Sequence, residues 1–224
     1  MLPNTFSAVC FDMDGVLIRS RDVITHAWAS VAHEYGIGLS ESCIQEHIHG
    51  RPGSHTLSVL FGQYAESERQ IIKQRVDAIE ETSLCQLVPG VREILQALAR
   101  FKVSVALVTS SWPARIAHVL DQHGLEKTFS TVVCRDDVTQ GKPDPACYLI
   151  AAARLRVPIE KCLVFEDSQS GAKAAISAGA QCLGIGDDAS LIALGARGLY
   201  SDFYPLLSVL EDDLAQRQAW GDAP

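Results

Sequence analysis

The sequence has no long apolar run, no internal repeat and no cluster of basic residues. A membrane-spanning helix needs about 18 or more consecutive apolar residues, so we expect no membrane partner. The N-terminal segment "MLPNTFSAVCFDMDG" has no basic start and reaches acidic residues early, which argues against a secretory signal peptide. These absences predict a cytoplasmic protein.

Charge and cysteine spacing argue against two further classes. The 19 Lys and Arg residues are scattered and outnumbered by 27 Asp and Glu residues, so the formal net charge is −8. Nucleic-acid binders concentrate basic residues on one face, so we expect no nucleic-acid partner, and an anionic ligand must be held locally. No Cys-x-x-Cys pair is present, which predicts reduced thiols rather than a disulfide framework. The cysteines are Cys10, Cys43, Cys85, Cys134, Cys147, Cys162 and Cys182.

Hydrophobic residues make up 47% of the 224 residues, enough for a sizeable core. Five short runs are apolar at consecutive rather than alternate positions, which predicts strands buried on both faces, as in a parallel sheet. Helical patterns such as "PGVREILQALAR" and "PARIAHVLDQHG" lie between the later runs. The sequence therefore predicts an α/β fold with a doubly wound, Rossmann-like and mainly parallel sheet. The runs cover residues 7–11, 103–108, 131–134, 162–165 and 181–186.

One long segment interrupts the alternation of strands and helices. Residues 21–85 contain helical patterns at 22–36 and 66–82 but no clear strand. We therefore expect an inserted α-helical cap domain of residues 19–85 and a catalytic core of residues 1–18 and 86–224. The insertion would lie above the carboxyl edge of the sheet, where open α/β sheets bind ligands.

Four polar motifs are expected at that same edge. Each is common by itself at turns and helix caps, so none is specific alone. Together they place acidic, hydroxyl and lysine side chains after successive strands, which is a more specific pattern. The motifs are "DMDG" with Asp12 and Asp14, "VTSS" with Thr109 and Ser110, "GKPDP" with Lys142, and "FEDS" with Glu166 and Asp167.

In this order the motifs resemble those of the haloacid-dehalogenase superfamily. The resemblance runs from Phe11 to about Gly186 and includes the inserted helical cap. It implies an enzyme that transfers the phosphoryl group of a small phosphorylated metabolite. The rival interpretation of "DMDG" as a calcium loop fails, because the loop would start at Cys10 and place Arg21 where a bidentate acid is needed.

The resemblance also implies roles for individual residues. Asp12 would attack phosphorus to form an aspartyl phosphate, and Asp14 would protonate the leaving oxygen and later accept a proton from water. Lys142, Thr109 and the backbone N–H of Ser110 would bind the phosphate oxygens.

Four acidic side chains that face a phosphate dianion require a cation, and oxygen ligands favour Mg²⁺. The resemblance assigns this ion to the side chain of Asp12, the backbone carbonyl of Asp14 and Asp167. Glu166 would be a ligand itself or lie next to the ligands. The seven histidines show no partner at zinc-ligand spacing, so we expect no zinc site.

Several members of the superfamily differ from this sequence. Dehalogenases and phosphonatases of this kind typically lack the second aspartate, and the cap position where hexose-phosphate mutases carry a histidine is Ile24 here. We therefore favour a phosphatase acting on a sugar or polyol phosphate, as a monomer or weak homo-oligomer. A mutase resembling β-phosphoglucomutase and a catalytically silent binding module on the same fold are the alternatives, although no catalytic motif is damaged.

Substrate choice is expected to depend on the cap segment "HIHGRPGSH". Its glycines and proline interrupt the helical pattern and could present Arg51 and His49 to the substrate. A simple connector between helices is the alternative. Arg19 stands where relatives usually carry an acid, so the sequence does not predict how the hinge of the cap is built.

Overall fold

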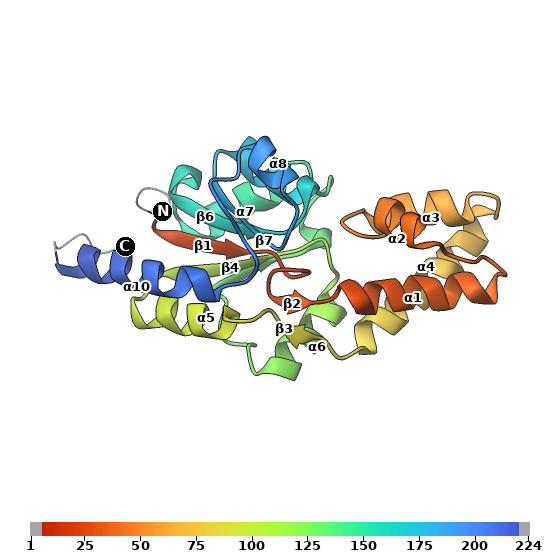
Figure 1. The fold of residues 1–224 in the computed structure, drawn as a ribbon, viewed down its shortest axis with the longest axis horizontal. Helices are drawn as coiled ribbons and strands as arrows, with labels where there is room; N and C mark the ends of the chain where they lie inside the picture. The colour runs from red at the N-terminus through yellow and green to blue at the C-terminus, as the bar shows by residue number, and fades with distance from the viewer. Residues whose placement is uncertain (1–5, 220–224) are drawn as a thin grey trace.

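A computed structural model describes residues 6–219 of the chain. Its centre is a parallel six-stranded sheet with the order β5-β4-β1-β6-β7-β8 (Figure 1). The predicted fold class is confirmed, and the five predicted runs form five of these strands. The short β8 has no counterpart in the sequence-based expectation. The strands are Ala8–Phe11 (β1), Ser104–Val108 (β4), Thr131–Val133 (β5), Cys162–Glu166 (β6), Gln181–Ile185 (β7) and Leu199–Tyr200 (β8).

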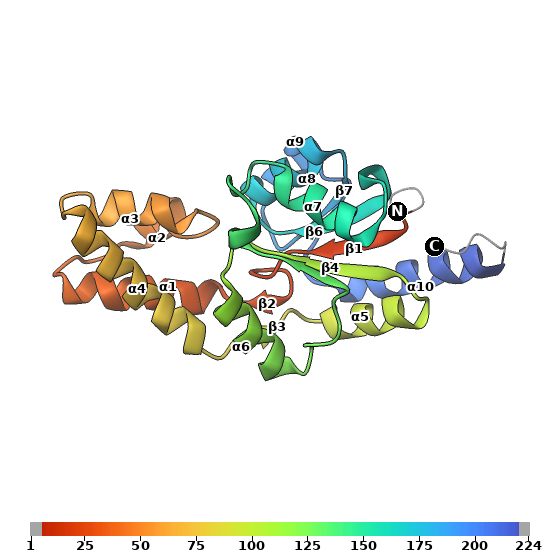
Figure 2. The same ribbon diagram turned by 180° about the vertical axis from the view of Figure 1, so that it is seen from behind.

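Helices cover both faces of the sheet (Figures 1 and 2). Val9 and Phe11 of β1 pack into one layer, whereas Ala8 and Cys10 pack into the other. Because both layers are buried, the strand is apolar at every position. The first layer contains α5 (Val91–Arg100), α6 (Pro113–His123) and α10 (Tyr204–Ala219). The second contains α7 (Ala146–Leu155), α8 (Gln169–Ala178) and α9 (Ser190–Leu194), and the 3₁₀ turns η1 (Arg135–Asp137) and η2 (Ile159–Lys161) precede α7 and β6.

Helix ends follow local sequence signals. Pro113 begins α6, where its missing N–H costs no hydrogen bond. Gly124 and Gly179 end α6 and α8 with φ values of 64° and 96°, in the left-handed region that glycine enters without steric cost. These signals fix where the chain leaves each helix and returns to the sheet.

The insertion consists of four helices that leave the core through a small ribbon. Strands β2 (Ile18–Arg19) and β3 (Gln86–Leu87) pair antiparallel, and the exposed Arg19 lies opposite Gln86. The sequence pattern gave no indication of this ribbon. The helices between the two strands are α1 (Arg21–Glu34), α2 (Glu41–His47), α3 (Gly53–Phe61) and α4 (Glu66–Thr82). We refer to residues 19–85 as the helical cap.

The helical cap has a hydrophobic core of its own. Trp28, Val31, Phe61, Ile72 and Val76 are buried together, and the cluster contains only cap residues. Figure 1 shows the four helices beside the carboxyl edge of the sheet, with the loop between α2 and α3 directed toward the core. The cap therefore packs as a unit next to the motifs.

The connections bring β1 to the centre of the sheet. From β1 the chain builds β4 and β5 on one side, and then β6, β7 and β8 on the other. The end of β1 thus lies at a switch in strand order, the usual ligand site of such sheets. All seven cysteines are free thiols. Within residues 6–219, no helix has both the length and the apolar character needed to cross a membrane.

Candidate active site

A buried lysine joins three of the strand ends. The Lys142 ammonium donates hydrogen bonds to Asp12 Oδ1 and Glu166 Oε1, both at 2.6 Å, and to the Val108 carbonyl at 3.1 Å. Its side chain is only 7% exposed. Asp12 follows β1, Val108 ends β4 and Glu166 ends β6. Lys142 therefore holds three neighbouring strands together at the carboxyl edge.

Glu166 is the most completely hydrogen-bonded of these groups. Its side chain is fully buried, and Oε1 accepts a second hydrogen bond from the Tyr148 hydroxyl at 2.7 Å. Oε2 accepts from the backbone N–H groups of Asp167 and Ser168 at 3.1 and 3.2 Å and from the Ser168 hydroxyl at 3.1 Å. Both oxygens are engaged, which favours a place beside a metal ion rather than among its ligands.

The acidic groups fit a divalent cation. Oxygen atoms of Asp12, Glu166 and Asp167 lie within 4.8 Å of one another. Burial raises the pKa of Asp12 to about 7, with Lys142 opposing and Glu166 adding to the shift, and burial raises the pKa of Asp167 well above its usual value. When all three carboxylates are ionised, the single Lys142 ammonium leaves two negative charges unbalanced. A hard divalent cation with oxygen ligands matches that charge and that donor set.

Asp14 lies outside this cluster and faces a different cation. Its Oδ1 and Oδ2 accept hydrogen bonds from Nη2 and Nη1 of Arg115 at 2.6 and 2.8 Å. Burial opposes ionisation of Asp14, but the Arg115 guanidinium outweighs burial and holds the pKa of Asp14 below its usual value. Ser20 also lowers the pKa of Asp14. Asp14 is therefore held as an ionised group.

The predicted phosphate-binding residues follow β4. Thr109 is 4% exposed, and its hydroxyl accepts a hydrogen bond from the Ser111 N–H at 3.1 Å. Ser110 is exposed at the same edge. The loop starts directly after Val108, whose carbonyl accepts from Lys142. The structure thus brings Thr109 and Ser110 to the strand end beside Lys142.

The two candidate cap residues differ in their surroundings. His49 is half-buried, and its Nε2 lies 2.7 Å from the Thr25 hydroxyl of α1. Arg51 is exposed, and its Nε donates to the Glu46 carbonyl at 3.0 Å. A Cβ placed on Gly50, between them, would lie 4.0 Å from the Cβ of Ser168. The loop therefore approaches the edge of the core where Glu166 and Asp167 lie.

Comparison with known proteins identifies the family. The sequence profile of haloacid dehalogenase-like hydrolases matches residues 6–179. The chain belongs to this family.

Two curated relatives have different activities in their names. A protein of Thermotoga maritima named "Phosphorylated carbohydrates phosphatase" is 35% identical over 216 residues, covering 92% of this chain and 99% of the relative. The "Beta-phosphoglucomutase" of Bacillus subtilis is 28% identical over 190 residues, covering 80% and 83%. The first match agrees with the expected phosphatase class of this enzyme.

A solved structure has the same fold over nearly the whole chain. It is a hydrolase of the haloacid dehalogenase family from Deinococcus radiodurans with bound phosphate and sodium. The two chains superpose with a TM-score of 0.76 at 29% identity, covering 95% of this chain and 98% of the other. The predicted superfamily is therefore confirmed by sequence and by fold.

Sequence reasoning missed two polar residues of this haloacid dehalogenase-like hydrolase. Tyr148 lies on α7 and bonds Glu166, and Arg115 lies on α6 and bonds Asp14. Arg115 did carry a detectable signal, because it occupies the same buried helix face as Ile116 and Val119. A charged residue on an apolar face requires a buried partner.

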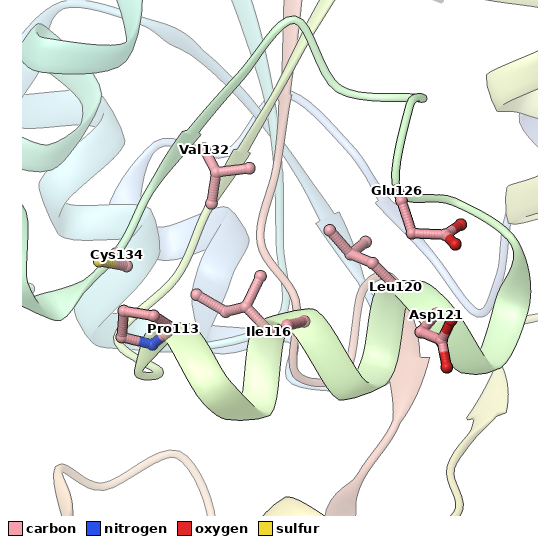
Figure 3. A pocket seen from close by; sticks show the side chains of 8 residues that line it. Pro113, Ile116, Leu120, Asp121, Glu126, Val132 and Cys134 are labelled. Carbon is pink, nitrogen blue, oxygen red and sulfur yellow. The ribbon is translucent and has the colours of Figure 1, made fainter.

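An apolar pocket lies apart from these groups. It has a volume of about 520 Å³ and lies between α6 and the edge strand β5 (Figure 3). Ile116, Leu120 and Val132 line it, with Asp121 and Glu126 as the acidic members. None of the predicted site residues contributes to its lining, so this pocket has no part in the chemistry proposed below.

The close packing of Gly171 against Glu166 gives a test of the site. A Cβ at position 171 would lie 1.8 Å from Glu166 Oε1. We expect Gly171→Ala to cost about 1–3 kcal/mol in the free energy of unfolding, measured in urea, and to reduce phosphatase activity by displacing Glu166. Alanine otherwise favours helices, so a loss here must come from the overlap.

Gly38→Ala is the matched control, because Gly38 is exposed, lies outside the four motifs, and a Cβ there meets nothing within 4 Å. This variant should keep the stability and the activity of the wild type. Equal effects of the two substitutions would contradict the role given to the contact between Gly171 and Glu166.

Proposed function

We propose that this haloacid dehalogenase-like hydrolase is a Mg²⁺-dependent phosphatase that releases phosphate from a small sugar or polyol phosphate through an aspartyl phosphate at Asp12. The main support is the Lys142 ammonium, which lies 2.6 Å from Asp12 at the switch point of the sheet. The relative named as a phosphatase of phosphorylated carbohydrates supports the substrate class. Seven free thiols are consistent with a reducing compartment such as the cytoplasm.

In this mechanism Asp12 attacks phosphorus. Lys142 binds Asp12 Oδ1, which leaves Oδ2 as the nucleophile. A bond forms between this oxygen and phosphorus while the bond from phosphorus to the substrate alcohol breaks, and Asp14 donates a proton to the departing oxygen. In the second step water attacks phosphorus, Asp14 accepts its proton, and inorganic phosphate leaves with restoration of the Asp12 carboxylate.

Asp12, Asp167 and the Asp14 carbonyl would hold the magnesium ion, with Glu166 beside them. The chemistry that such an ion supplies is charge neutralisation and polarisation of the phosphoryl group. Lys142, Thr109 and the Ser110 N–H would bind phosphate oxygens as charge moves during transfer. The helical cap, residues 19–85, would exclude bulk water and select the substrate above the core of residues 1–18 and 86–224.

Removal of the metal tests the charge argument. After EDTA treatment and desalting, we expect hydrolysis of phenyl phosphate to fall by about 100-fold or more, because two negative charges then oppose the incoming dianion. Added MgCl₂ should restore the rate. Undiminished turnover of the treated enzyme, with no magnesium found by elemental analysis, would refute the metal requirement.

Substitution of Asp12 tests the nucleophile. Asp12→Asn should lower turnover by at least about 1,000-fold and abolish covalent labelling of the protein by a ³²P-labelled aryl phosphate after acid quenching. Asp187→Asn is the control, because the Asp187 side chain is 88% exposed, and its label and rate should be unchanged. Labelling that persists in Asp12→Asn would assign the covalent intermediate to another residue.

The cap loop gives a third test. Arg51→Ala should raise KM for sugar phosphates by about tenfold and leave KM for phenyl phosphate nearly unchanged, because only the larger substrates reach the loop. Arg75→Ala is the control, since Arg75 pairs with Glu34 of the cap, and it should affect neither substrate. Equal effects of Arg51→Ala on both substrates would exclude Arg51 from substrate choice, and an isomerised sugar phosphate as product would establish a mutase.

A further inference from the structure

Arg115 is buried between the core and the helical cap. It is 2% exposed on α6, and the two ends of its guanidinium fork hold both oxygens of Asp14. Nη1 also donates to the Ser111 hydroxyl at 3.1 Å, in the loop that follows Thr109 and Ser110. Such a paired contact fixes the plane of the Asp14 carboxylate as well as its position.

The third nitrogen of Arg115 points to the cap. Within the part of the chain that the structure describes, Arg115 Nε is buried and has no hydrogen-bond partner. Oε2 of Glu80 on α4 lies 3.7 Å from this nitrogen, and the Glu80 side chain is 10% exposed. This distance is within ion-pair range but too long for a hydrogen bond. A shift of α4 by less than about 1 Å would complete the bond.

Helix α4 is joined to this region by a second contact. Trp112, three residues before Arg115, donates from Nε1 to Glu81 Oε2 at 2.7 Å. The Trp112 ring also lies 5.7 Å from the Arg115 guanidinium and 5.4 Å from the Lys73 ammonium of α4. Movements of the end of α4 therefore reach the start of α6 directly.

A proton-transfer group must present one of its oxygens to the leaving group. Each carboxylate oxygen has two lone-pair sites, so Asp14 can accept the two Arg115 hydrogen bonds and keep one site on each oxygen for the transferred proton. The plane in which Arg115 holds the carboxylate therefore decides where that site points.

We propose that Arg115 is a positioning residue shared between Asp14 and Glu80. It holds the plane of the Asp14 carboxylate through Nη1 and Nη2, and Glu80 of α4 fixes the guanidinium from the Nε side, which sets the direction of the Asp14 oxygen for proton transfer. This inference rests on the proposed phosphatase function, because it assigns Asp14 the role of acid and base. Arg115 and Glu80 themselves touch no reacting atom.

The test compares two small aryl phosphates whose leaving groups differ in their need for a proton. Phenyl phosphate has a poor leaving group that needs a proton, whereas 2,4-dinitrophenyl phosphate has a good one that does not. We expect Glu80→Gln to lower kcat/KM for phenyl phosphate about tenfold and for the dinitrophenyl ester less than about twofold. Glu81→Gln is the matched control, because Glu81 is the next residue on α4 but bonds Trp112; it should change both values by the same factor.

A double-variant series shows whether Glu80 acts through Arg115. Arg115→Met should reduce kcat/KM for phenyl phosphate selectively, Arg115→Lys should restore part of it, and Glu80→Gln added to Arg115→Met should cause less than about twofold further change. Equal effects of Glu80→Gln on both esters, or its full effect in the Arg115→Met background, would overturn the proposal.

The outcomes separate this inference from the function on which it rests. Wild-type turnover of both esters without the predicted selectivity in Glu80→Gln would contradict only the role of Arg115 and Glu80. Absence of turnover by the magnesium-loaded wild type would contradict both proposals. If Arg115→Met does not fold, the pair Glu80→Gln and Glu81→Gln still decides the matter.

Discussion

The ion pairs of Lys142 are the interaction on which the site depends. One ammonium group joins Asp12 and Glu166, and with them the ends of β1 and β6, in a place almost closed to water. Removing one member of such a buried set leaves an uncompensated charge, which typically costs about 3–5 kcal/mol. The same ammonium leaves an excess of negative charge among the carboxylates. This excess is the basis on which we propose that a divalent cation binds there.

Glu166 also contacts the helices α7 and α8 that pack beside the sheet. Tyr148 reaches it from α7, and Ser168 caps α8 while donating to the same carboxylate. Gly171 leaves the space that the carboxylate fills. Two helices are therefore placed by hydrogen bonds and by steric fit to a single side chain. This arrangement explains why a fully buried acid is compatible with a stable fold, because every oxygen has donors.

The sequence predicted the strands and the residues that meet at their shared edge, and it missed the contacts that leave no local pattern. The strands were predicted because burial on both faces makes each run apolar throughout, and the meeting of Asp12, Lys142 and Glu166 followed from the common edge of parallel strands. The ribbon of β2 and β3 has only two residues in each strand, too few for a pattern. The bond from Arg115 to Asp14 spans 101 positions, and only the apolar face of α6 hinted at it.

The cap and the sheet domain have separate hydrophobic cores. The cap core draws only on cap residues, so its loops can change without disturbing the strand ends that carry the chemistry. The two units nevertheless meet where α4 touches α6, through Trp112 with Glu81 and Arg115 with Glu80. These contacts lie beside Asp14, the group that would donate and accept the proton in the proposed mechanism. Because Arg115 holds Asp14 and faces Glu80, a displacement of α4 would reach the proposed proton-transfer group through one side chain.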